Sequence, residues 1–221
     1  MCGRYTLINP KRIKKRFKAK NKMEPQDPSF NIAPGMYLPT ITRNSPNKIT
    51  FMRWGFVPGW NKNKSFFMMN VRDDTIKSKI YFQNKIKTNR CLVPTDGFFE
   101  WKKKKTSRGI DKIPYYIYLK DNPLFSFAGI YNKRSDAEGN DIFTFAIITT
   151  KPNHLVKEIH DRMPVILDKK DENRWLDEKN TNPNNLQSML TSYPPGKMDA
   201  HIVSSQVNNP KNDSIKLIQP I

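Results

Sequence analysis

The feature that most limits how this chain can fold is a series of short β-rich runs, each ended by Pro, Gly or Asn, that begins at Tyr37. Such runs predict seven strands, at residues 38–42, 49–54, 66–71, 97–101, 115–119, 124–131 and 142–149. Helical patterns are fewer, at residues 75–87, 154–160, 172–179 and 185–191, and they do not alternate regularly with the strands. The pattern therefore favours an α+β fold with a mostly antiparallel sheet over a doubly wound one.

The organisation of the chain is simple. It has no internal repeat, low-complexity tract or long linker, so we expect residues 1–221 to form a single compact domain. No apolar run approaches the ~20 residues that a membrane span needs, and the start lacks a signal-peptide stretch, so we expect an intracellular protein. The two cysteines, Cys2 and Cys91, should then remain thiols, and we expect Cys91 to be buried packing. No Cys and His have metal-ligand spacing, which predicts neither a metal nor a cofactor.

The charge is strongly positive: 39 Lys and Arg against 20 Asp and Glu give +19. A surface of this kind attracts polyanions, of which nucleic acid is the commonest, although a generally lysine-rich surface explains the count equally well. Many of the cations crowd residues 11–22, where Ile13 and Phe17 at i, i+4 predict a short helix after Pro10 with a solvated basic face.

Cys2 carries the most specific chemical signal. Cysteine is small enough for Met1 to be removed by ordinary processing, and this places an amine and a thiol on adjacent carbons. An α-amino group titrates near ~7.8 against ~10.4 for lysine, so far more of it is neutral at pH 7. With an aldehyde it forms an imine, which the thiol closes to a five-membered thiazolidine. Taken alone, a cysteine at position 2 is also consistent with chance.

Two further side chains suit proton transfer. Glu100 lies in Gly-Phe-Phe-Glu-Trp, where large apolar neighbours raise a carboxyl pKa by desolvation. His160 follows a helical pattern and has Asp161 and Arg162 beside it, so it could titrate near neutrality. Considered alone, Glu100 is equally consistent with a partner in a structural ion pair, and His160 is equally consistent with a cap at the end of a helix. Of the tryptophans, Trp54 suits the core, and Trp60 on a Pro-Gly turn suits an exposed stacking surface.

Read together, these segments resemble the SOS-response-associated peptidase family, whose members shield abasic sites in DNA. The matching segments run in order along nearly the whole chain: Met1-Cys2-Gly3-Arg4-Tyr5, Asn31-Ile32-Ala33-Pro34-Gly35, the block from Trp54 to Trp60, Asn70-Val71-Arg72, Pro94-Thr95-Asp96-Gly97-Phe98-Phe99-Glu100-Trp101, His160-Asp161-Arg162-Met163-Pro164, Val207-Asn208-Asn209 and Ile218-Gln219-Pro220. Their joint order makes the resemblance specific.

The resemblance implies a compact, largely β fold with a barrel-like core and a cleft for single-stranded DNA, acting as a monomer without a cofactor. It implies that Cys2 bonds to the ring-opened sugar of an abasic site, that Asn70 positions the amine or the sugar, and that Glu100 relays protons. His160 would act on the sugar hydroxyl and assist reversal. The remaining implied residues contact DNA: Arg4, Arg72 and Arg162 hold phosphates, and Pro34 and Trp60 pack against bases. The family also implies a lyase activity and a peptidase activity that exposes Cys2, for which methionine removal suffices here.

The chain departs from the family pattern at two positions. Asp74 replaces a glutamate, which leaves the role of this acid open, and Asn61 replaces a second tryptophan found in some relatives. Two other functions remain as alternatives. An N-terminal-nucleophile glutaminase also begins Met-Cys-Gly, but it gives no reason for the charge of +19. A non-catalytic basic module for nucleic acid explains the charge and leaves Cys2, Glu100 and His160 without a role.

Overall fold

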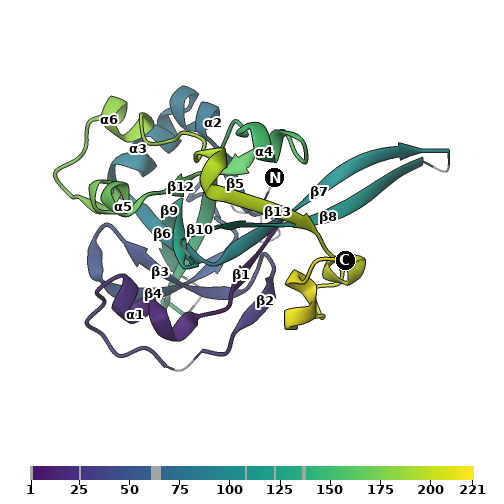
Figure 1. Ribbon diagram of the computed structural model, residues 1–221. Helices are drawn as coiled ribbons and strands as arrows, with labels where there is room; N and C mark the ends of the chain where they lie inside the picture. The colour runs from purple at the N-terminus through teal and green to yellow at the C-terminus, as the bar shows by residue number, and fades with distance from the viewer. Residues whose placement is uncertain (1, 25, 61–65, 108, 122, 136–137) are drawn as a thin grey trace.

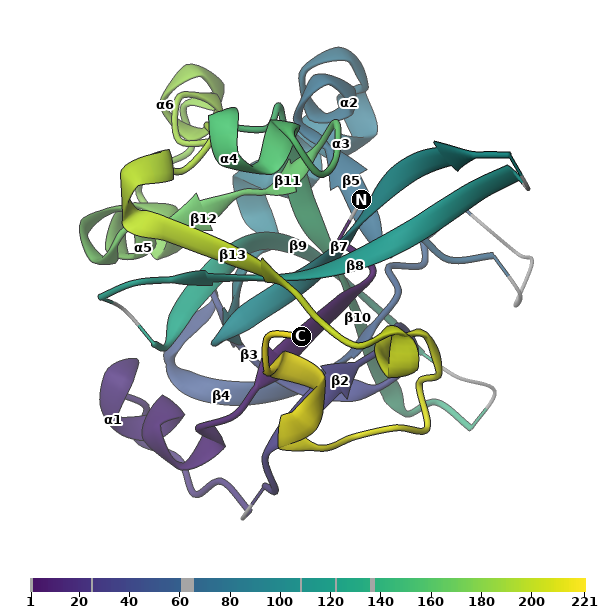
Figure 2. The ribbon, with the colours of Figure 1, turned by 45° about the vertical axis from the view of Figure 1, so that its right-hand side comes forward.

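The computed structural model of the chain describes residues 2–24, 26–60, 66–107, 109–121, 123–135 and 138–221. Met1 and Asn61, on which two of the expectations fall, lie outside these ranges. The described strands form two sheets, and most of the helices gather along one side of them (Figures 1 and 2).

Five strands pair in a closed ring. In ring order they are β10 (Asp141–Thr150), β4 (Ser45–Trp54), β3 (Tyr37–Thr42), β6 (Arg90–Thr95) and β9 (Phe125–Ser135), with β9 pairing back to β10. Only the β10–β4 pair in the ring is parallel. Closure removes the edges of the sheet, and β6 is buried at every residue because both of its faces are covered. The predicted α+β fold with a barrel-like, mostly antiparallel core is confirmed.

The second sheet carries the start of the chain. Its order is β13 (Met198–Ile202), β8 (Gly109–Leu119), β7 (Gly97–Thr106), β1 (Arg4–Leu7) and β2 (Ser29–Ile32). Its apolar face packs on the barrel through aromatic rings: the Tyr5 and Trp54 centroids lie 5.0 Å apart, and those of Phe98 and Phe127 lie 5.8 Å apart. These contacts fix β1 and β7 on the barrel, and Cys2 and Glu100 with them.

Short elements complete the fold. The small strands are β5 (Asn70–Arg72), β11 (Met163–Pro164) and β12 (Ile166–Leu167), and the α-helices are α1 (Ile13–Arg16), α2 (Asp73–Ser78), α3 (Ile80–Thr88), α4 (His154–Lys157), α5 (Lys169–Leu176) and α6 (Pro183–Gln187). Single 3₁₀ turns lie at η1 (Pro10–Arg12), η2 (Pro195–Lys197), η3 (Ser205–Asn208) and η4 (Ile215–Ile218). None of the helices seen in the described residues has the length and apolar character that crossing a membrane requires.

Two predicted elements are interrupted in the structure. The helix expected at 75–87 is two helices, because Lys79 between them is extended, with φ −110° and ψ 117°. The strand expected at 66–71 is reduced to a bridge between Met68 and Phe56 followed by β5. Neither break is marked by Pro or Gly, so tertiary packing decides it rather than local sequence.

Candidate functional site

The structure brings together the four residues for which chemistry was predicted, from four separate parts of the chain. The Asn70 side chain of β5 donates a hydrogen bond from Nδ2 to the Cys2 carbonyl oxygen, 2.8 Å away. On β7, Glu100 Oε2 lies 3.9 Å from His160 Nε2, in the segment that follows α4. The Glu100 charge also acts on the Cys2 thiol. The site therefore lies where the start of the chain meets both sheets.

Asn70 is held by its backbone. The buried Trp54 donates from Nε1 to the Met69 carbonyl oxygen at 2.9 Å, and the Ile147 amide donates to the same oxygen at 3.1 Å. Parallel pairing of β5 with β10 then sets the direction of the Asn70 side chain. Its Oδ1 is buried and accepts no hydrogen bond from the described residues. Asn70 thus keeps one acceptor available beside Cys2.

Burial controls the protonation of the thiol and the carboxyl. Cys2 has no exposed surface, and this burial, with a smaller effect of Glu100, raises the pKa of its thiol well above the ordinary range. Glu100 is 1% exposed, and loss of solvent raises the pKa of its carboxyl to about 7. At neutral pH the thiol keeps its proton, whereas the carboxyl is close to half ionised and can both give and accept one.

His160 is the more accessible partner. Its Nδ1 lies 3.1 Å from the Arg162 amide, which donates to it, and 2.9 Å from Asp161 Oδ1, which would accept only if Nδ1 carried a proton. Burial lowers the pKa of His160, which favours the neutral ring with Nδ1 as acceptor. The ring proton is then on Nε2, and it points toward Glu100.

Arg72 and Asp74 form an exposed ion pair just outside the site. Arg72 Nη2 lies 2.6 Å from Asp74 Oδ2, and Arg72 Nε donates to both carboxylate oxygens at 3.1 and 3.0 Å. This bond to Asp74 raises the pKa of Arg72. The acid whose role the sequence left open therefore orients the Arg72 guanidinium and partly neutralises it.

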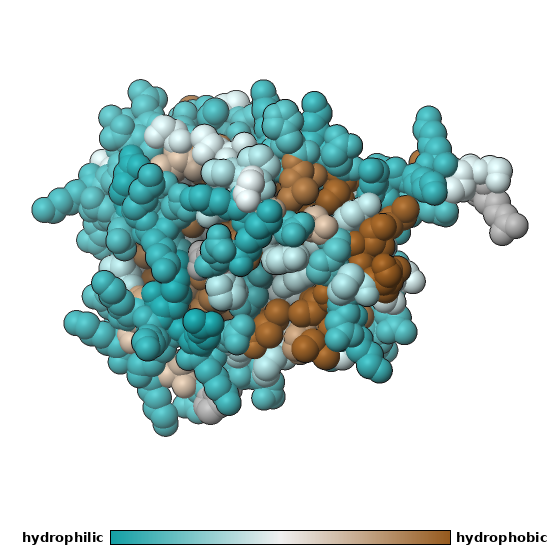
Figure 3. All heavy atoms as spheres, viewed as in Figure 1, coloured by the Kyte–Doolittle hydropathy of each residue, from teal (hydrophilic) through white to brown (hydrophobic). Residues whose placement is uncertain are grey.

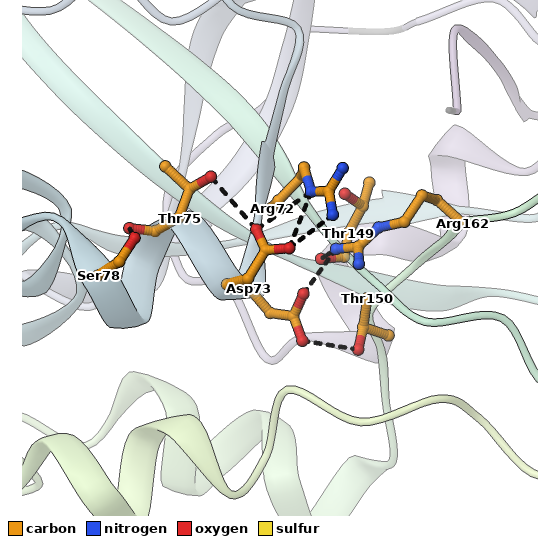
Figure 4. A network of polar contacts seen from close by, with 8 residues as sticks. Arg72, Asp73, Thr75, Ser78, Thr149, Thr150 and Arg162 are labelled. Carbon is orange, nitrogen blue, oxygen red and sulfur yellow. Dashed lines mark hydrogen bonds and ion pairs between the residues drawn. The ribbon is translucent and has the colours of Figure 1, made fainter.

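A second, buried ion pair lies behind it and was missed at the level of sequence. Arg162 Nη2 donates to Asp73 Oδ1 at 2.6 Å and to the Thr149 carbonyl oxygen at 2.5 Å, and Thr150 donates to Asp73 Oδ2 at 3.1 Å (Figure 4). Arg162 is 6% exposed, so its side chain faces the interior. The pair ties the segment after His160 to the start of α2, directly after Asn70-Val71-Arg72. No single-sequence signal distinguishes Asp73 from an ordinary helix-start acid.

Arg4 joins three of the motif segments. It donates from Nη1 to Asn31 Oδ1 and to the Val207 carbonyl oxygen, both at 2.8 Å, and from Nη2 to the Asn208 carbonyl oxygen at 3.3 Å. Asn31 in turn donates to backbone carbonyls of the same C-terminal segment. These three motif segments therefore share a structural role, which is to hold the C-terminal segment on β1 and β2.

The two predicted stacking residues, Pro34 and Trp60, both lie in turns. Pro34 is half-buried in the turn before β3, where the Gly35 amide donates to the Trp54 carbonyl oxygen at 2.7 Å. Trp60 is 63% exposed, as expected, and its ring centroid lies 6.3 Å from that of Phe66. The neighbouring Phe67 ring lies over Gly55, whose φ of +133° and tight contact exclude a side chain. We call the exposed rings Tyr37, Trp60, Phe66 and Phe67 the aromatic edge.

The basic stretch lies elsewhere. It folds as the short helical segment that was predicted there, η1 followed by α1, and it lines a groove of about 1070 Å³ against α5. Arg16 makes a paired contact with Glu172 there, at 2.9 and 2.8 Å. No site residue named above lines this groove. In the described part of the chain, no three His, Cys, Asp or Glu side chains come together as metal ligands.

The fold and the site define one class: a barrel-containing α+β protein whose second residue is a cysteine beside a buried carboxyl, a histidine and an asparagine. The chain belongs to the SOS response associated peptidase (SRAP) family, which it matches over residues 1–210.

Named relatives and solved structures agree with this assignment. Over 225 residues the chain is 43% identical to the abasic site processing protein YoqW of Bacillus subtilis (strain 168), with 99% of both chains covered. It is 28% identical to the abasic site processing protein HMCES of Pongo abelii, covering 100% of this chain and 76% of that one. The crystal structure of a protein from Bacteroides thetaiotaomicron aligns over 100% of both chains, with a TM-score of 0.87 and 29% identity.

Proposed function

We propose that this chain recognises abasic sites in single-stranded DNA and bonds to them covalently through Cys2, once Met1 has been removed. The observation that carries the proposal is the placement of the buried Glu100 carboxyl, with a pKa of about 7, beside Cys2 and His160. The names of the relatives supply the lesion, because an abasic sugar opens to an aldehyde.

The reaction needs two proton transfers that one carboxyl can perform. The Cys2 amine adds to the aldehyde carbon, and loss of water from this adduct gives an imine; protonated Glu100 supplies the proton to the departing hydroxyl. This imine keeps its N–H hydrogen and is therefore cationic. The thiol sulfur adds to the imine carbon, the π electrons pass to nitrogen, and the thiol proton passes to ionised Glu100, so the ring nitrogen ends as a neutral N–H. The net change is one thiazolidine formed and one water released.

The surrounding residues have separate roles in this proposal. Asn70 holds the Cys2 carbonyl and leaves its own buried Oδ1 for the new amine, which fixes the direction of the nucleophile. His160 Nε2 stands at the exposed side of Glu100, where it meets the sugar hydroxyl and assists reversal. Pro34 and the aromatic edge stack bases. The exposed Arg72 holds a phosphate, and the half-buried Arg4 does so through the guanidinium N–H groups that its bonds to Asn31, Val207 and Asn208 do not use.

In this proposal Arg162 has a structural role rather than a role in binding phosphate. Its guanidinium is occupied by Asp73 and the Thr149 carbonyl, so it positions the segment of His160. A phosphate would reach Arg162 only by displacing Asp73.

A glutaminase reaction fits this site less well. It requires an activated thiolate as nucleophile, whereas burial raises the pKa of the Cys2 thiol. Incubation of the chain with glutamine should release no ammonia above the Cys2→Ala background.

The proposal is tested by incubating the protein with two single-stranded oligonucleotides that differ only in one abasic site. The expected result is a protein–DNA species on a denaturing gel with the abasic strand and none with the intact strand. Equal trapping of both strands, or trapping of neither by a protein of verified mass without Met1, would contradict it. Strand cleavage products on the same gel report any lyase reaction from the imine.

A further inference from the structure

Strands β7 and β8 extend well beyond the sheet to which they belong. They pair in unbroken register from Gly97 opposite Tyr118 to Thr106 opposite Gly109. However, β1 pairs with β7 only as far as Phe99, and β13 pairs with β8 only from Tyr115 onward. Residues 102–106 and 109–113, which we call the arm, therefore pair only with each other, and Figures 1 and 2 show the two strands projecting from the body.

The arm is basic and its lysines have no partner in the described chain. It carries Lys102, Lys103, Lys104, Lys105 and Lys112, all exposed except the half-buried Lys102. No ion pair with a described residue involves any of them. Lys103 stands directly opposite Lys112, and like charges in such a pair are destabilising, whereas Lys104 stands opposite Asp111, the one acid among the described residues of the arm. Figure 3 shows the arm as a mostly hydrophilic projection.

An isolated two-stranded ribbon is marginally stable at best, so an arm with opposed lysines is not explained by folding. Its charge is complementary to rows of phosphates. The arm also begins two residues after Glu100 on the same strand, so DNA that is held at the site can continue along the arm.

The lysines lie on both faces of the ribbon. Because side chains alternate along a strand, Lys102 and Lys104 share one face, while Lys103, Lys105 and the opposed Lys112 share the other. A single DNA strand lying along the ribbon would meet only one face. The major groove of B-DNA, about 12 Å wide, admits a two-stranded β-ribbon and presents a phosphate row on each side of it.

We propose that the arm enters the major groove of double-stranded DNA that flanks the lesion and that its lysines contact both phosphate rows. The inference rests on the proposed function, since it takes the site at the base of the arm to hold the abasic residue. From Glu100 to Lys105 the strand spans about 17 Å at ~3.3 Å per residue, which corresponds to about five base pairs. Because the arm leaves the site in one direction, only one of the two flanks should be bound.

The test compares two variants with the same reduction in charge. The arm variant is Lys103→Gln, Lys105→Gln and Lys112→Gln; the control is Lys11→Gln, Lys14→Gln and Lys15→Gln, three exposed lysines of the η1–α1 stretch that lies away from the arm in both ribbon views. All six side chains lack ion pairs with described residues, so neither variant should lower the thermal unfolding midpoint, which serves as the folding check.

Binding is measured with DNA that carries a tetrahydrofuran analogue of the abasic site, which has no aldehyde. Non-covalent binding by the arm is thus measured separately from the covalent step. A protein that formed no adduct with a true abasic site would contradict the proposed function, but its binding to the analogue would still test the arm. Three probes are used, a plain single strand and the same strand with a complementary strand on its 5′ or its 3′ flank.

The arm variant should bind one flanked probe at least tenfold more weakly. The slope of log K against log salt should be smaller by roughly 0.9 for each phosphate that the variant no longer neutralises. Its binding to the single strand, and the control's binding to all probes, should change less than threefold. An equal weakening on the single strand, or an equal weakening in the control variant, would overturn the proposal.

Discussion

The inner and outer halves of strand β7 differ in what surrounds their charged side chains. In the inner half, Glu100 is buried between the sheets, and its pKa is raised to about 7. In the outer half, four consecutive lysines stand on the arm, with Lys103, Lys104 and Lys105 exposed to water. A buried charged group can be reactive, but its burial lowers the stability of the fold. Several exposed charges together raise the affinity for a charged ligand, and each changes the stability of the fold very little.

The largest effect should come from Cys2→Ser. A hydroxyl closes the five-membered ring poorly, so the variant should stop at the imine, which heat reverses and from which the DNA strand can be cleaved. The heat-stable adduct should disappear while strand cleavage rises. Cys91→Ala, a change at the other buried thiol, should retain the adduct. A heat-stable adduct in the Cys2→Ser protein would remove the thiol from the mechanism.

Glu100→Gln should slow covalent capture by roughly 10²–10⁴-fold, the usual contribution of a positioned acid–base group. Binding to the tetrahydrofuran probe should be unchanged, because the side chain keeps its size and lies inside the site. The measurement is single-turnover adduct formation on a denaturing gel. A variant as fast as the parent would show that Glu100 moves no proton.

Arg162→Met tests whether removing a buried cation lowers the stability of the fold more than removing an exposed lysine of the arm does. It leaves Asp73 without its charged partner, and the unfolding free energy should fall by about 3–5 kcal/mol. Denaturant unfolding measures this, with Lys103→Gln as the exposed control. Adding Asp73→Asn should restore most of the stability. If Arg162→Met and Lys103→Gln proved equally mild, the ion pair would not organise the His160 segment.

The same Glu100→Gln change should stabilise the fold at high pH. The folded-state pKa lies above the ordinary 4.5, so ionisation costs stability progressively as pH rises from 4.5 to about 7. At pH 8 the variant should be more stable than the parent by about 3 kcal/mol, and near pH 4 the two should be alike. Thermal unfolding across this range provides the check; a difference independent of pH would mean that the carboxyl is not buried as described.

The smallest effect should come from Trp60→Ala. Stacking of a base on an aromatic ring contributes ~1–3 kcal/mol, which is roughly 5- to 150-fold in affinity for single-stranded DNA. Ile221→Ala, at a side chain 83% exposed in the C-terminal segment, is the control for removal of exposed apolar surface. Equal effects of the two changes would argue against stacking at the aromatic edge.

The sequence predicted the fold class and the chemical residues better than it predicted their supports. Strand runs such as 142–149 are visible because barrel strands are buried on both faces and read as apolar, and β10 (Asp141–Thr150) differs from that run by one residue at each end. Glu100 and Cys2 stand out because their residue types are unusual at those positions.

What the sequence could not show depends on contacts between distant segments. The pairing of Asp73 with Arg162 and the clasp of Arg4 on Asn31 and Val207 bring together residues far apart in the chain. The arm was missed for a different reason: β7 was predicted to end at Trp101, because four lysines do not resemble a strand. In the structure, pairing with β8 overrides that preference.

In the proposed reaction, the freed amine and thiol of Cys2 form the bond to DNA. The most direct measurement is peptide mapping by mass spectrometry of the adduct, after the DNA is digested to its sugar remnant. We expect the remnant on a peptide that begins at Cys2, with no free thiol on that residue and with an added mass equal to that of the sugar less one water. A remnant on a lysine of the arm or on any other residue would contradict it.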